Sequence, residues 1–101
     1  MTVSVSATAQ SEIDAAAAYY HSISPRLAVR LLKESADVMQ FIDDHPRMYR
    51  RTSSNVRIAS LRSFPFELYY RVRLSGTQVI RFLPARIDPE TKQARIASAN
   101  N

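Results

Sequence analysis

The chain contains no cysteine and only one glycine among its 101 residues. Without cysteine it cannot form disulfide bonds, thiolate nucleophiles or cysteine-based zinc sites. A phosphate-binding loop needs several glycines, so the sequence does not support nucleotide hydrolysis. These absences direct attention to functions that depend on packing and charge.

Long apolar runs are also missing. No stretch approaches the ~18 consecutive apolar residues of a membrane-spanning helix, and residues 1–10 lack the basic residue that opens a secretory signal. The sequence therefore predicts a cytoplasmic protein. Its length and its 46% hydrophobic content predict one domain over residues 1–101 with a modest core. We expect residues 97–101 to form a frayed tail.

Charge is distributed unevenly along the chain. Residues 1–44 carry three basic and six acidic residues, a net charge of −3, whereas residues 45–101 carry eleven basic and three acidic residues, a net charge of +8. The basic half could bind an anionic partner, such as a nucleic acid or an acidic protein surface. The alternative is that its arginines serve only solubility.

Two helical patterns fill the first half. An apolar stripe predicts a first helix with Thr8 as its N-cap. Ser24 and Pro25 predict the start of a second helix, since the serine oxygen can accept an orphan amide hydrogen and the proline has none. This helix should end near His45, because Pro46 disfavours the α conformation of the residue before it. The stripe of the first helix comprises Ala9, Ile13, Ala16, Ala17 and Tyr20.

Alternating patterns predict strands over residues 2–6, 56–61, 66–74 and 77–83. Gly76 lies where a tight turn needs positive φ, and a short helix is expected from the Asp88 region to about Ile96. The fold class is therefore α+β, with an N-terminal strand and a helical hairpin packed on a mostly antiparallel four-stranded sheet. Alternation assigns Phe66, Leu68, Tyr70, Val72 and Leu74 to a core face, and Glu67, Tyr69, Arg71 and Arg73 to an exposed basic face. In the last strand it assigns Ile80 and Phe82 to one face, and Val79, Arg81 and Leu83 to the other.

A series of short motifs follows the order of these elements. They are Tyr19-Tyr20, Ser24-Pro25-Arg26-Leu27-Ala28, Val56-Arg57, Phe64-Pro65-Phe66, Tyr70-Arg71-Val72, Ala85-Arg86 and Asp88-Pro89. With this order and spacing, residues 3 to about 90 resemble the RelE/ParE superfamily of bacterial type II toxins. The resemblance implies a cognate antitoxin as partner, in a hetero-oligomer, and a part in plasmid stabilisation.

The superfamily has two kinds of target. RelE-like members are ribosome-dependent mRNA endonucleases, which need a general base and a general acid. ParE-like members inhibit DNA gyrase by binding. Many superfamily members have a histidine before an arginine at the end of the fourth strand, and Leu83 to Arg86 contains none. Glu67 and Tyr69 are the remaining candidates for base and acid, although a glutamate in this position is more commonly the cross-strand partner of an arginine.

We therefore predict a ParE-like toxin that acts by binding. The alternatives are a RelE-like mRNA endonuclease and a non-toxic member that binds only its antitoxin. No cofactor or metal is expected, since His45 beside Asp43 and Asp44 has no second histidine nearby and suits the helix dipole. The predicted target-binding residues are Arg57, Arg62, Arg71, Arg73, Arg81 and Arg86.

Overall fold

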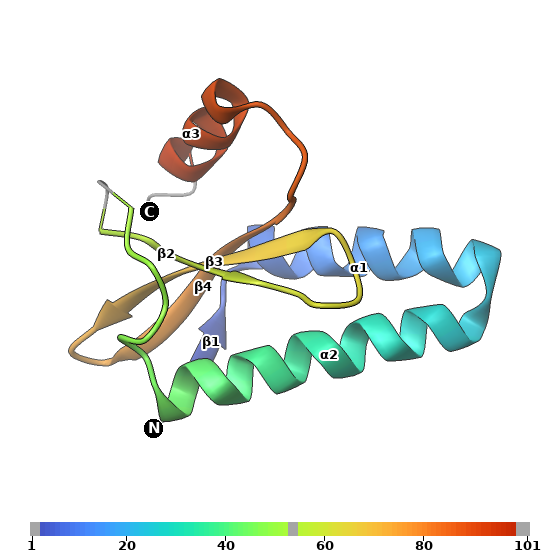
Figure 1. Ribbon diagram of the computed structural model, residues 1–101, viewed down its shortest axis with the longest axis horizontal. Helices are drawn as coiled ribbons and strands as arrows, with labels where there is room; N and C mark the ends of the chain where they lie inside the picture. Colours follow the sequence, from blue (N-terminus) through green and yellow to red (C-terminus); the bar gives the residue numbers. More distant parts are fainter. Residues whose placement is uncertain (1–2, 53–54, 99–101) are drawn as a thin grey trace.

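The computed structural model describes residues 3–52 and 55–98. A helical hairpin covers one face of the sheet and a third helix lies against the other (Figure 1). This arrangement confirms the predicted α+β fold. The elements are β1 (Val3–Val5), α1 (Ala7–Ile23), α2 (Pro25–Asp44), β2 (Arg57–Ser60), β3 (Phe66–Arg73), β4 (Gly76–Pro84) and α3 (Pro89–Ser98).

The four strands form one mixed sheet in the order β1-β4-β3-β2. Strand β1 pairs with β4 in parallel, while the β2–β3 and β3–β4 pairs are antiparallel. The mostly antiparallel sheet was predicted correctly. Thr2, the first residue of the predicted N-terminal strand, lies outside the described residues, as do residues 99–101 of the predicted tail.

Helix α1 begins two residues earlier than predicted, and its N-cap is Ser6 rather than Thr8. The Ser6 hydroxyl accepts a hydrogen bond from the amide of Ala9 (3.1 Å) and donates one to the carbonyl of Ile80 (3.1 Å). It therefore caps the helix and ties its start to β4. The predicted stripe is confirmed, because Ala9, Ile13 and Ala16 are buried.

Helix α2 follows α1 after Ser24 alone. Pro25 occupies its first position as predicted, but the Ser24 side chain makes no capping hydrogen bond within the described chain. The Ser24 carbonyl instead accepts from the amide of Leu27 (3.0 Å). The helix ends where predicted, and the amide of His45 donates to the carbonyl of Phe41 (2.8 Å).

The main core lies between the helical hairpin and the sheet. Leu31 and Ile42 of α2 are fully buried there, together with Leu68 and Tyr70 of β3. The Tyr70 hydroxyl donates to the carbonyl of Pro46 (2.9 Å) and so holds the segment after α2 over the core. The prediction that Tyr70 faces the core is confirmed. The assignment of Leu74 to the same core face is wrong, because β3 ends at Arg73 and Leu74 is fully exposed in the turn that follows.

A β-bulge breaks the alternation of β4. Tyr69 pairs with Arg81 while Tyr70 pairs with Val79, so Ile80 is an extra residue on the β4 side. Val79 consequently packs on the hairpin face, like Phe82, whereas Ile80 and Leu83 pack on the face of α3. The predicted grouping of Ile80 with Phe82, and of Val79 with Leu83, is therefore wrong.

A second, smaller core fills the opposite face of the sheet. Ile96 of α3 packs there against Val56, Tyr69, Ile80 and Leu83. Tyr69 is only 1% exposed, so its predicted place on a solvated face is wrong: α3 covers that part of the sheet. Helix α3 continues through residues 97 and 98, which were expected in the frayed tail. Among the described helices, none combines the length and apolar character needed to cross a bilayer.

Candidate functional site

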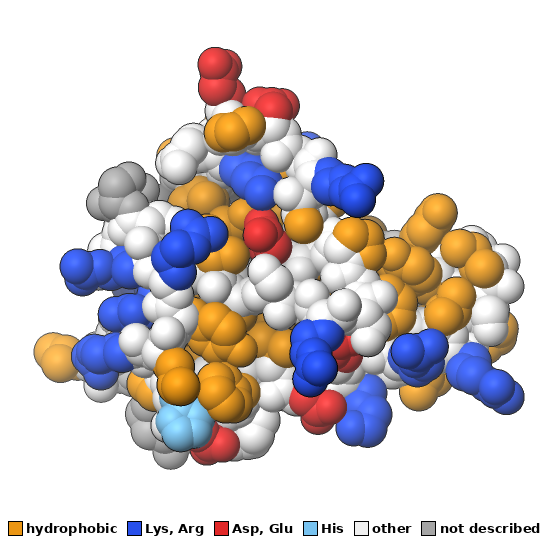
Figure 2. Space-filling view, in the orientation of Figure 1, with side chains coloured by type: hydrophobic (Ala, Val, Ile, Leu, Met, Phe, Trp, Pro, Cys, Tyr) orange, Lys and Arg blue, Asp and Glu red, His pale blue; other side chains and the backbone are white. Residues whose placement is uncertain are grey.

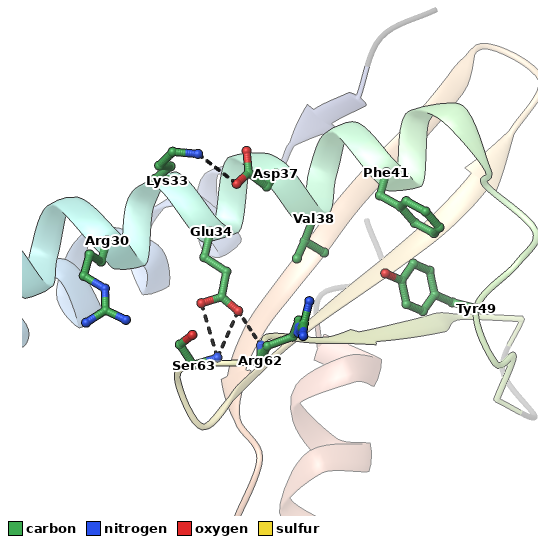
Figure 3. Close-up of a pocket in the computed structure, with 9 residues that line it drawn as sticks. All are labelled: Arg30, Lys33, Glu34, Asp37, Val38, Phe41, Tyr49, Arg62 and Ser63. Carbon is green, nitrogen blue, oxygen red and sulfur yellow. Dashed lines mark hydrogen bonds and ion pairs between the residues drawn. The ribbon is translucent and has the colours of Figure 1, made fainter.

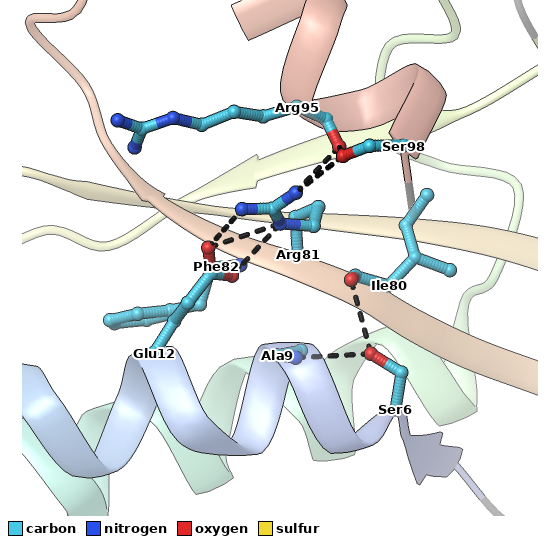
Figure 4. A network of polar contacts seen from close by, with 8 residues as sticks. All are labelled: Ser6, Ala9, Glu12, Ile80, Arg81, Phe82, Arg95 and Ser98. Carbon is cyan, nitrogen blue, oxygen red and sulfur yellow. Dashed lines mark hydrogen bonds and ion pairs between the residues drawn. The ribbon is translucent and has the colours of Figure 1, made fainter. Parts of the chain in front are cut away.

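The six predicted target-binding arginines do not form one surface. Arg81 is only 9% exposed, and its predicted position on an exposed face is wrong. Its guanidinium forms an ion pair with Glu12 of α1, with Nε 3.0 Å from Oε2, and also donates to the carbonyl of Arg95 in α3 (2.6 Å) (Figure 4). The amide of Phe82 donates to the same carboxylate (2.8 Å). Arg81 thus joins three elements inside the protein.

The other five arginines divide between separate surfaces. The Arg57 guanidinium donates to the carbonyls of Arg47 (3.1 Å) and Tyr49 (2.7 Å), and it thereby holds the segment between α2 and β2. Arg62 lies in the exposed turn between β2 and β3, and Arg86 is exposed ahead of α3. Near the end of β3, Arg71 is half-buried and Arg73 is exposed, two residues apart on the same face.

A groove of about 800 Å³ runs between α2 and the turn that joins β2 to β3 (Figure 3). We call it the α2 groove. Glu34 links its two sides, since its carboxylate accepts from the amides of Arg62 and Ser63, the latter at 3.0 Å. The residues that line the α2 groove are Arg30, Lys33, Glu34, Asp37, Val38, Phe41, Tyr49, Arg62 and Ser63.

The α2 groove combines an aromatic end with unpaired cations. Phe41 is 40% exposed, and its ring lies edge-on to that of Tyr49 at 5.8 Å. Lys33 pairs with Asp37 (3.1 Å), whereas the guanidinium groups of Arg30 and Arg62 form no ion pair among the described residues. The backbone amides of Arg62 and Ser63 compensate the charge of Glu34, so this carboxylate does not oppose an acidic partner. The groove therefore suits a partner segment that carries both apolar and acidic side chains.

Glu67 and Tyr69, the candidate base and acid, lie side by side in a cleft of about 490 Å³ beside α3. The Tyr69 hydroxyl donates to Glu67 Oε1 (2.7 Å), and Lys92 Nζ lies 3.1 Å from the same oxygen. The partner of Glu67 is therefore a lysine of α3 and not a cross-strand arginine. Arg50 and Arg51 line the same cleft.

The chemistry of this cleft does not favour proton transfer. Burial raises the pKa of Tyr69 above its ordinary value, and the hydrogen bond to Glu67 and the charge of that carboxylate raise it further. A general acid works best when its pKa is close to the operating pH, so this shift makes Tyr69 a poorer proton donor. Glu67 forms an ion pair with Lys92, so its carboxylate has a structural role that needs no catalytic explanation.

Several site residues were missed by the sequence analysis. Lys92 stands 25 positions from Glu67, and Glu34 stands 28 from Arg62, so no local pattern could have paired them. Arg50 and Arg51, which line the cleft of Glu67 and Tyr69, are both exposed.

His45 packs its ring against that of Phe41, with 4.7 Å between the centroids. Within residues 3–52 and 55–98, no group of three or more potential ligand residues lies close enough to hold a metal ion.

Comparison with known proteins places the chain in a family. Residues 3–89 match the family model described as ParE toxin of type II toxin-antitoxin system, parDE. Among solved structures, a chain of "Chromosomal ParDE TA system from P. aeruginosa" matches with a TM-score of 0.75 and 21% sequence identity. The match covers 85% of this chain and 97% of that chain. No curated protein sequence matches the chain.

Proposed function

The chain belongs to the ParE toxin family of type II toxin-antitoxin systems, and we propose that it inhibits DNA gyrase by binding and is neutralised by a cognate antitoxin. The observation that carries the proposal is the family match over residues 3–89, which includes the helical hairpin and the whole sheet. Gyrase acts on DNA in the cytoplasm, where we expect this protein to work.

The state of the candidate acid–base pair supports binding rather than catalysis. A nuclease needs one group that gives up a proton and another that accepts it. Here the Tyr69 hydroxyl is buried and donates to Glu67, and Lys92 neutralises that carboxylate. Both side chains therefore have a structural role. Inhibition through surface contacts explains them more simply than catalysis does.

The α2 groove supports the antitoxin partner. It offers exposed Phe41 as an apolar anchor, with Arg30 and Arg62 available for carboxylates. We propose that the antitoxin lays an amphipathic, acidic segment over the sheet and helical hairpin, with this groove as one contact. Such contacts combine apolar burial with charge complementarity.

The test pairs two assays on the same purified protein: supercoiling by gyrase and mRNA cleavage on translating ribosomes. We expect inhibited supercoiling with intact message. Glu67→Gln and Tyr69→Phe should leave inhibition nearly unchanged, because neither side chain performs chemistry. A nuclease would instead lose about 10² to 10⁴ in rate with either change.

Other outcomes would contradict the proposal. Cleaved message with unaffected gyrase would assign the protein to the RelE-like mRNA endonucleases. If neither assay responds while the product of the adjacent small reading frame still binds, the chain is a non-toxic antitoxin-binding member. Failure of that product to bind would refute the antitoxin part.

A further inference from the structure

The cleft that Glu67 and Tyr69 line is bounded by basic side chains, and we call it the α3 cleft. Arg50 and Arg51, from the segment before β2, line one part of it, and Lys92 of α3 lines another. Basic side chains gather on this face of the molecule below α3, on the side of β2 (Figure 2). Its volume of about 490 Å³ lies in the range of small-molecule sites. The α3 cleft is therefore large enough for a ligand of that size.

The two arginines of the α3 cleft have no acidic partner. Both are exposed, and neither forms an ion pair within the described part of the chain. The Arg51 guanidinium donates only a long hydrogen bond to Asn55 Oδ1 (3.5 Å). Burial and the neighbouring Glu67 raise the pKa of Tyr69, whereas the charge of Arg50 acts in the opposite direction. The charge of Arg50 is therefore felt at the floor of the cleft.

Lys92 keeps one hydrogen-bond donor for a ligand. Its ammonium group carries three N–H donors. Two of them have partners, Glu67 Oε1 (3.1 Å) and the carbonyl of Ala85 (2.9 Å). The Lys92 side chain is 23% exposed, and no further partner of it lies among the described residues. The third donor is thus available to an acceptor in the cleft.

The α3 cleft is cationic even when its carboxylate is counted. Glu67 is the one acidic residue among its described lining residues, against three basic residues, which gives a net charge of +2. The acidic residues at the start of α3 lie outside this lining, since Asp88 caps the helix and Glu90 lines a separate depression along it. A phosphate monoester carries about −1.5 to −2 charges at neutral pH, so it matches this balance.

Apolar side chains line the cleft beside these cations. Pro89 is exposed and Ile58 is half-buried. Ligand sites commonly combine apolar walls with a few polar groups that fix the orientation of the ligand. A ligand with a flat ring and a phosphate group can therefore use both parts of the cleft.

We propose that the α3 cleft binds a nucleoside monophosphate. Arg50, Arg51 and Lys92 bind its phosphate group, because the guanidinium fork and the ammonium group both donate charge-assisted hydrogen bonds to phosphate oxygens. Ile58 and Pro89 pack against its base. The bound phosphate joins the segment before β2 to α3 and so holds α3 on the sheet.

This inference goes beyond the proposed function, because it involves neither gyrase nor the antitoxin. The ligand is bound and is not converted, so no proton carrier is required in the cleft. Nucleotide binding and inhibition of supercoiling are measured in separate assays, and either proposal can fail without the other.

The test is isothermal titration calorimetry of the full chain with adenosine monophosphate. We expect saturable binding at one site. R50Q/R51Q should weaken it about tenfold or more, because the double variant removes two charge-assisted contacts. In the native chain the nucleotide should also slow amide hydrogen exchange in α3, and in R50Q/R51Q it should not.

The matched control is R26Q/R86Q, which removes the same charge from two exposed arginines outside the cleft. It should bind the nucleotide as the native chain does, and thermal unfolding should show that both variants remain folded. Equal losses of affinity in the two double variants would overturn the proposal, since overall charge would then explain binding. Absence of saturable binding by the native chain would also overturn it.

Further ligands test the two parts of the site and the source of the phosphate. Inorganic phosphate bound as tightly as adenosine monophosphate would overturn the role of Ile58 and Pro89, and adenosine bound as tightly would overturn the role of the cations. A short strand with a 5′-phosphate is compared with the same strand without it. Tighter binding of the phosphorylated strand than of the free nucleotide would identify the ligand as the end of a nucleic acid, whereas weaker binding would identify it as a free nucleotide.

Discussion

At the scale of single residues, two adjacent tyrosines are buried on opposite sides of one strand. Tyr70 lies in the core under the helical hairpin, and Tyr69 lies in the smaller core under α3. Each hydroxyl has a partner, the carbonyl of Pro46 for Tyr70 and the carboxylate of Glu67 for Tyr69. Burial is the main cause of the raised pKa of both groups. Strand β3 is thus the layer that both cores share.

Tyr70→Ala should lower the free energy of unfolding by about 3 to 5 kcal/mol, because it removes a fully buried ring and leaves a cavity. Tyr19→Ala is the matched control, since Tyr19 is 62% exposed and should cost about 0.5 kcal/mol or less. Urea unfolding of both variants measures the difference. Equal losses would mean that Tyr70 contributes no more to the core than a surface ring.

At the scale of elements, α3 is attached to the sheet by few groups. Ile96 is its only buried residue, and Lys92 adds contacts to Glu67 (3.1 Å) and to the carbonyl of Ala85 (2.9 Å). The start of α3 is capped by Asp88, which accepts from the amide (2.9 Å) and hydroxyl (2.7 Å) of Thr91. These hydrogen bonds hold the pKa of Asp88 below its ordinary value of 3.8.

The first turn of α3 should loosen in acid. Because the folded-state pKa of Asp88 is lowered, its contribution is present above the unfolded value and is lost as the pH falls through the folded value. Amide hydrogen exchange in α3, followed from neutral pH to below 3.8, should show this loss. Asp88→Asn can still cap the helix but cannot titrate, so it should remove the pH dependence. An unchanged pH dependence of amide exchange in that variant would refute the role of Asp88.

At the scale of the whole molecule, one ion pair connects both layers of helices through the sheet. Arg81 extends from β4 to Glu12 of α1 and to the backbone of Arg95 in α3, and its side chain is 11% exposed. Loss of one partner of a buried pair leaves the other charge without compensation. The pair therefore matters more to the fold than the surface arginines do.

Arg81→Ala should lower the free energy of unfolding by about 3 to 5 kcal/mol. Exposed Arg86 provides the control, and Arg86→Ala should change stability by about 0.5 kcal/mol or less. Denaturant unfolding measures the free energy of unfolding of both variants. Losses of equal size would show that water screens the pair, and Arg81 would then return to the set of candidate target contacts.

The sequence by itself determined the order of the elements and the nature of the main core. Helical stripes, the Ser24-Pro25 start and the Gly76 turn are local signals, because they depend on residues a few positions apart. Gly76 indeed has a φ of 126°. The burial of Tyr70 followed from period-two alternation within a single strand. The resemblance to the RelE/ParE superfamily rested on the same local motifs in order.

Only the tertiary structure decided which residues meet across the chain. The bulge at Ile80 depends on how β4 pairs with β3, and the burial of Tyr69 depends on where α3 docks. Arg81 lies 69 positions from Glu12, so its removal from the surface could not be read from neighbouring residues. Charge and periodicity predict how polar a face is, but contacts between distant segments determine whether that face reaches solvent.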